Sequence, residues 1–142
     1  MMVKKVTLFL LLLFCLFVFP QNKKLDDMSF GEIEKKIDSL AFSKKNAFSI
    51  INFYIKKAKK EKNQEALVYA YRYATKASDN EFDGLRFADS AIIIAKRHNN
   101  TKLLSEAFFN KGVYLMDNFR NAEALDNILI ANKYSIILKI LN

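Results

Sequence analysis

Few residues in this chain are of the types that carry out catalysis. The 142 residues include one histidine, His98, and one cysteine, Cys15, which lies inside an apolar N-terminal run. These two residues are too few for a metal site of cysteines and histidines, and the position of Cys15 in that run rules out a Cys–His nucleophile pair. Its three glycines are scattered, whereas a phosphate-binding loop needs several close together. The sequence predicts a protein that is not an enzyme and that holds no metal or other cofactor.

The acidic and imidazole side chains fit structural roles in helices. His98 falls at the end of an expected helix, where a partly cationic ring interacts favourably with the helix dipole. Carboxylates at the expected caps or on polar helix faces are interpreted as structural or solvating: Glu32, Glu34, Asp79, Asp83 and Asp126.

Basic residues outnumber acidic ones, 23 to 15, for a formal charge of +8. The run KKAKKEK, residues 56–62, is of the kind that binds phosphate backbones or anionic lipid headgroups. It also completes the polar face of an amphipathic helix near its C-terminus, where cations are favourable. We interpret the run as a solvated face. Binding of anionic lipid or nucleic acid by a membrane-anchored intracellular module stays open as the alternative.

Residues 1–21 have the composition of a signal peptide or signal anchor. Two lysines precede an uncharged apolar run from Val6 to Phe19, and Pro20 follows. As a helix the run would span about 21 Å, which is short for a bilayer. Small residues of a cleavage site are missing before Pro20, so an uncleaved tether stays open. We expect an exported protein, periplasmic or tethered to the membrane.

The remainder of the chain predicts an all-α fold. No proline follows Pro20, whereas the tight turns of an all-β domain commonly need glycine and proline. Apolar residues recur at steps of three and four. Residues 22–42 are expected to form a polar spacer and a short helix, and residues 43–142 helical repeats of about two and a half units. The expected helices cover residues 29–40, 43–62, 63–78, 85–98, 102–117 and 121–138, with Asn63 and either Asn100 or Thr101 as N-caps.

A repeat runs through these helices. Short connectors make neighbouring helices antiparallel, so the chain forms a train of hairpins. A shift of 36 residues superposes two small–large–small triplets in the second helices of successive hairpins: Ala88, Ile92 and Ala95, and Ala124, Ile128 and Ala131. Small residues at such places let neighbouring helices approach closely.

The last hairpin resembles the tetratricopeptide repeat (TPR) family. That family has an aromatic residue, a glycine four residues later, and then a triplet of this type. Lys111 departs from the family pattern, and the repeat-ending proline is missing. In the preceding unit Ala74 stands where the glycine would be, and the turn is about two residues longer than the family norm. The residues that match the motif in the last unit are Phe108, Gly112, Ala124, Ile128 and Ala131.

The resemblance implies a right-handed superhelix of stacked hairpins, an α-solenoid, whose first helices line a groove for a protein or peptide segment. An exported segment of this type also resembles the sensory part of bacterial TPR-containing membrane regulators, whose output is signalling or transcription. We expect no small-molecule substrate, and nucleic acid is a poor partner for a chain that is exported. By position, the groove residues are Tyr71, Thr75 and Ser78 in one unit and Glu106, Phe109, Val113, Met116 and Asp117 in the next.

The C-terminal stretch YSIILKILN is apolar to its end. A helical stack is normally capped by a helix with a polar outer face. We expect an exposed apolar end that is covered by a partner, by self-association, or by further sequence of a longer regulator from which this chain is truncated. The residues concerned are Ile136, Ile137, Leu138, Ile140 and Leu141.

Overall fold

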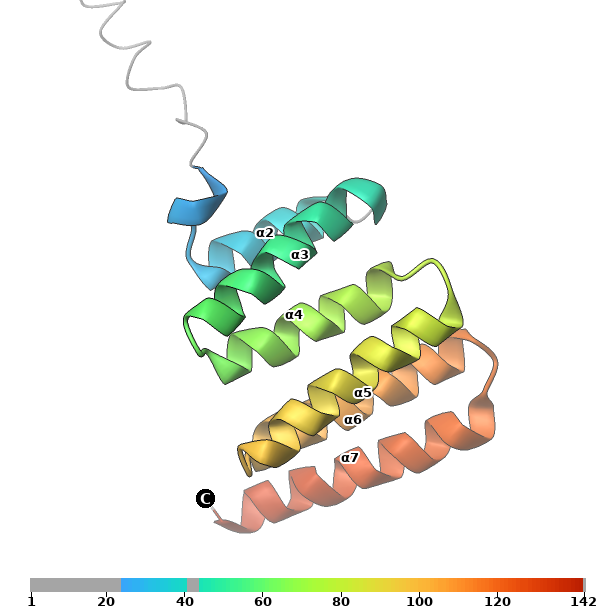
Figure 1. The fold of residues 1–142 in the computed structure, drawn as a ribbon. Helices are drawn as coiled ribbons and strands as arrows, with labels where there is room; N and C mark the ends of the chain where they lie inside the picture. The colour runs from blue at the N-terminus through green and yellow to red at the C-terminus, as the bar shows by residue number, and fades with distance from the viewer. Residues whose placement is uncertain (1–23, 41–43, 142) are drawn as a thin grey trace, which may run out of the picture.

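A computed structural model of the chain describes residues 24–40 and 44–141. Every element within these ranges is helical, which confirms the all-α prediction for this part (Figure 1). The expected signal or anchor lies outside the described residues. The elements are the 3-10 helix η1 (Leu25–Asp27) and the α-helices α2 (Phe30–Ser39), α3 (Lys44–Lys60), α4 (Gln64–Ala77), α5 (Glu81–Arg97), α6 (Thr101–Asp117) and α7 (Asn121–Leu141).

Side-chain caps fix where several helices begin. Ser29 and Glu32 form the capping box that their spacing predicts at the start of α2. The side-chain oxygens of Asn63, Asn80 and Asn100 each accept a hydrogen bond from the backbone N–H three residues on, at 2.9, 2.8 and 3.0 Å. The expected cap at Asn63 is confirmed, and of the two candidates before α6 Asn100 is the cap. These bonds satisfy N–H groups that have no partner inside the helix.

The helices stack in chain order, each against the next (Figure 1). In addition α4 contacts α6, so the first helices of two successive hairpins lie next to each other, with α5 packed against both. Two connectors of this stack carry a residue with positive φ directly before the capping asparagine, Lys62 at 53° and Asn99 at 48°. Such a left-handed residue lets one helix end and the next begin within a very short turn.

Two hydrophobic clusters form the core. The first joins α2, α3 and α4, and includes Ile33, Ile51 and the fully buried ring of Tyr54, whose hydroxyl donates to Glu34. In the second, Val68 of α4 meets α5, α6 and α7. The helix α2 is therefore packed into the same core as the repeats.

The residues expected at repeat contacts lie in the interior, apart from Ile128, which is partly exposed. Gly112 approaches α7 so closely that a Cβ there would be 3.0 Å from the carbonyl oxygen of Ala124. Phe108 stacks on Tyr134 with ring centroids 5.9 Å apart. The other buried members of this set are Ala74, Ala88, Ile92, Ala95, Ala124 and Ala131.

Candidate partner-binding groove

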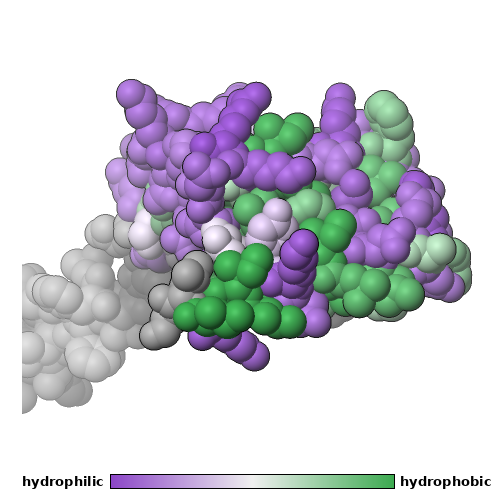
Figure 2. Space-filling view, turned by 90° about the horizontal axis from the view of Figure 1, so that it is seen from below, coloured by the Kyte–Doolittle hydropathy of each residue, from purple (hydrophilic) through white to green (hydrophobic). Residues whose placement is uncertain are grey.

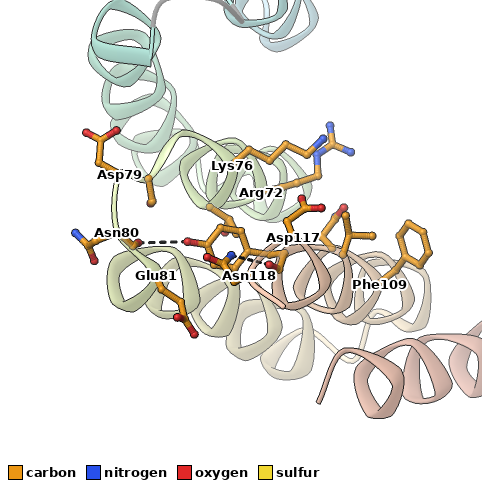
Figure 3. A pocket seen from close by; sticks show the side chains of 13 residues that line it. Arg72, Lys76, Asp79, Asn80, Glu81, Phe109, Asp117 and Asn118 are labelled. Carbon is orange, nitrogen blue, oxygen red and sulfur yellow. Dashed lines mark hydrogen bonds between the residues drawn. The ribbon is translucent and has the colours of Figure 1, made fainter. Parts of the chain in front are cut away.

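A surface cavity of about 620 Å³ lies between α4, the α4–α5 connector and α6 (Figure 3). Five of the eight residues expected to line a groove belong to its wall: Thr75, Ser78, Phe109, Val113 and Asp117.

The α4 wall is cationic. The guanidinium of Arg72 lies over the rings of Tyr69 and Tyr73, with its Cζ 5.0 and 5.1 Å from their centroids. Stacking on two aromatic faces holds this charge in place. Lys76 follows one turn later and is exposed. Figure 3 shows both side chains extending from α4 towards the side from which Asp117 and Phe109 project.

The α6 wall combines an apolar and an acidic group. Phe109 is 51% exposed, although it is a large aromatic residue. Asp117, two turns further along, is also exposed. Within the described ranges neither Asp117 nor Lys76 makes an ion pair or hydrogen bond, so both charges face solvent without a protein partner.

Tyr114 closes the floor of the cavity. Its hydroxyl donates to the backbone oxygen of Asn80 at 3.3 Å, and the Asn118 side chain donates to the Tyr114 carbonyl at 2.7 Å (Figure 3). The ring fits only because residue 84 is glycine: a Cβ on Gly84 would lie 2.0 Å from the Tyr114 hydroxyl oxygen. Burial, together with the nearby carboxylate of Glu81, raises the pKa of Tyr114.

Three expected groove residues lie outside this cavity. Tyr71 is partly buried and stacks on Phe87, with centroids 6.1 Å apart. Met116 is 50% exposed and is not part of this cavity's wall. Glu106 lines a second cavity of about 410 Å³ between α6 and α7, which it shares with Phe109.

Glu106 has one carboxylate oxygen, Oε2, that is buried without a hydrogen-bond partner among the described residues. Burial raises the pKa of the neighbouring Tyr69, and the carboxylates of Glu106 and Glu65 add to that effect. The Tyr69 hydroxyl donates to Glu65 at 3.2 Å. A buried carboxylate oxygen without a donor is costly, and a donor or cation brought by a partner would relieve it.

Part of the cavity wall lies outside the set of groove residues that the sequence predicts. Arg72 and Lys76 line the cavity beside Thr75. Arg72 lies three positions before Thr75 and four before Lys76, and residues at these spacings are neighbours on a helix surface, so the expected position of Thr75 in the groove already implies theirs. Asp79 and Asn80 of the α4–α5 connector and Glu81 at the start of α5 also belong to the wall. Nothing local in the sequence indicates that this connector turns towards α6.

Comparisons with protein-family models, with curated proteins and with solved structures found no match. The candidate site therefore stands on its geometry and on the sequence pattern. Among the described residues no helix is long and apolar enough to cross a membrane. The same part of the chain contains no group of three or more His, Cys, Asp or Glu side chains placed to hold a metal ion.

Proposed function

We propose that this chain is an exported helical-repeat scaffold that binds a protein or peptide segment along α4 and α6. The stack is proposed to continue the TPR-like arrangement, a short right-handed superhelix with these first helices on its inner side. By the same resemblance, the segment would act as the sensory part of a membrane-bound regulator.

The shared position of Phe109 supports this proposal most directly. Its side chain lines both the cavity against α4 and the smaller one against α7. The two hollows therefore adjoin along α6 and form an elongated surface. An elongated surface suits an extended or helical segment, whose successive side chains enter separate hollows, better than it suits a compact small molecule.

The charges around Phe109 indicate the chemistry of that segment. Arg72 and Lys76 stand on one wall, and Asp117 stands on the other. A segment with an apolar anchor residue, an acidic group towards α4 and a basic group towards α6 would match these walls. Charge complementarity of this kind sets orientation and partner choice more than affinity.

A site-specific photo-crosslink tests the proposal. The photoreactive residue p-benzoylphenylalanine replaces Phe109 in the full chain, expressed in its own cells. In the control it replaces Ile93, an α5 residue that lines none of the described cavities and is exposed to a similar degree, 48% against 51%. We expect an adduct of discrete mass at position 109 and not at position 93.

Two further variants decide whether such an adduct comes from groove binding. Lys76→Glu reverses a charge on the α4 wall, and Lys96→Glu makes the same change at an exposed position of α5 outside the cavity. The adduct at position 109 should be lost with the first variant and kept with the second. Equal adducts at positions 109 and 93, no adduct at 109, or equal effects of both charge reversals would refute the proposal.

A further inference from the structure

The outer face of α7 carries an apolar stripe that nothing in the described chain covers. Leu125, Leu129, Ile136 and Ile140 are 57%, 57%, 49% and 76% exposed. Their steps of four, seven and four residues place them on one side of the helix. Figure 2 looks at the face of the molecule along which α7 runs and shows hydrophobic side chains gathered there, with hydrophilic ones between them.

The preceding hairpin carries this stripe only in part. Under the 36-residue shift, Leu129 corresponds to Ile93 of α5, which is 48% exposed. Leu125, however, corresponds to Asp89 of α5, whose carboxylate pairs with Lys111 at 2.6 Å. The shift places the end of α5, Arg97, at Lys133, whereas α7 continues to Leu141. Ile136 and Ile140 thus belong to a helical extension with no counterpart in α5. Their apolar character needs another explanation.

The stripe is symmetric about its own midpoint. Measured from the point between Asn132 and Lys133, Leu129 and Ile136 are equally distant, and so are Leu125 and Ile140. A helix with such a stripe is complementary to a second copy of itself that runs the opposite way. We propose that the α7 face binds the α7 face of a second copy of this chain, antiparallel and about a two-fold axis that passes between Asn132 and Lys133. Leu129 and Asn132 also line the smaller cavity between α6 and α7, so the second copy would compete with a segment bound in that cavity.

Asn132 gives the pair its register. Its side chain is exposed at the middle of the stripe. A carboxamide is both donor and acceptor, so next to a two-fold axis it can bond to its own copy. One polar residue within an apolar helix interface fixes register, because any shift would leave its hydrogen-bonding groups buried without partners.

Charges favour the antiparallel direction. In that arrangement Asp126 of one copy lies level with Lys139 of the other, whereas a parallel pair would bring like charges level with each other at both positions. The exposed Lys133 lies beside its own copy in either direction, so it does not affect this choice. The helix dipoles also oppose each other favourably when the helices are antiparallel. A head-to-tail pair would bring α7 against the outer surface of α2, whose exposed residues are polar or glycine: Gly31, Glu32, Lys35, Lys36, Asp38 and Ser39.

The expected dimer is weak. Fifteen residue steps of helix, from Leu125 to Ile140, span about 22 Å. One helix pair of that length falls at the small end of specific protein interfaces, and we expect a dissociation constant on the order of micromolar. The dimer should therefore form at the raised local concentration of a membrane or a concentrated solution.

Disulfide cross-linking of the full chain tests both the contact and its direction. Cys15→Ser first removes the other thiol. On this background, Asn132→Cys should form a disulfide dimer under mild oxidation, because packed helices bring the two Cα atoms near the axis within reach. Leu125→Cys alone should stay monomeric, since its copies would be about 22 Å apart. Leu125→Cys mixed with Ile140→Cys should yield the cross-linked heterodimer.

Several cross-linking results would contradict the proposed α7–α7 contact. A monomeric Asn132→Cys protein would overturn the proposal, as would a Leu125→Cys protein that dimerises by itself. Leu129→Asp combined with Ile136→Asp should abolish the Asn132→Cys dimer while the helical circular dichroism is unchanged, because both side chains are exposed. If the dimer persists in this variant, or if Asn132→Cys instead forms adducts with another protein, the α7 face is not an interface between copies.

Discussion

Gly112 of α6 lies against Ile128 of α7, so closely that a methyl group on the glycine would be 2.7 Å from the Ile128 Cγ1. The nearest backbone atom, the Ala124 carbonyl oxygen, would be 3.0 Å away. The distance between these two helices is therefore set by the absence of a side chain at residue 112.

Gly112→Ala should destabilise the protein. Alanine favours a helix over glycine by about 1 kcal/mol, but the added methyl overpacks the α6–α7 contact. Because the obstructing atoms include backbone, we expect a net loss of about 1–3 kcal/mol in the free energy of unfolding, measured by urea denaturation of the full chain.

Gly31→Ala is the matched control, since a Cβ there would meet nothing within 4 Å. It should be neutral or stabilising by up to about 1 kcal/mol. Adding Ile128→Ala to Gly112→Ala should cost less than the two single changes together, because the smaller side chain makes room for the methyl. Equal effects of the two glycine substitutions would refute the close-packing role of Gly112.

Gly84→Ala should act on the groove more than on stability. The new methyl would occupy the place of the Tyr114 hydroxyl, but that ring is partly exposed and can rotate away. Its departure removes the floor of the cavity. We expect partner capture at position 109 to fall about tenfold, equivalent to about 1.4 kcal/mol.

Tyr114→Phe separates the ring from its hydrogen bond, because it removes only the hydroxyl that donates to Asn80. Capture should change little in this variant, since the ring still closes the floor. If Tyr114→Phe lowers capture as much as Gly84→Ala does, the hydrogen bond and not the shape of the floor controls binding.

Alkaline pH should destabilise the protein through three tyrosines that are buried or partly buried. Burial and the hydrogen bond to Glu34 raise the pKa of Tyr54 above its ordinary value of 10.0. Burial likewise raises the pKa of Tyr69 and of Tyr73. Above about pH 10 the unfolded chain releases these protons while the folded chain retains them, so the free energy of unfolding falls as pH rises; below pH 10 this contribution is fully present.

Tyr54→Phe provides the check on this pH dependence. It removes one titrating group and should cost about 0.5–1.5 kcal/mol at neutral pH through the lost hydrogen bond. Its stability should then decline less steeply above pH 10 than that of the unsubstituted chain, in urea titrations followed by circular dichroism. Parallel curves for the two proteins would show that Tyr54 is not among the responsible groups.

An export reporter distinguishes the exported scaffold from the alternative of a membrane-anchored intracellular basic module. Fused to the C-terminus of the chain, the reporter should be active outside the cytoplasm. Lys56, Lys59 and Lys60 are exposed. If the chain is exported, binding to anionic vesicles and to RNA should be weak, and replacement of these three lysines by glutamine should leave it unchanged. Cytoplasmic retention, with strong salt-dependent binding that the glutamine variant loses, would instead favour the intracellular basic module.

The sequence by itself determined the helices and several of their ends. Apolar spacing of three and four, the capping box at Ser29 and the cap at Asn63 depend on neighbours within a few residues, so they can be recognised without the fold. The length of α7 was underestimated, because its last turns, up to Leu141, carry no cap or breaker that marks an end.

Only the tertiary structure decided how the candidate groove is built. The cavity depends on the approach of α4 to α6 across an intervening helix, and the place of Tyr114 on its floor depends on Gly84 of that helix. Likewise, the sequence showed that the end of α7 is apolar, but burial decided which residues remain exposed. Contacts between residues far apart in the chain depend on helix positions, which local periodicity does not encode.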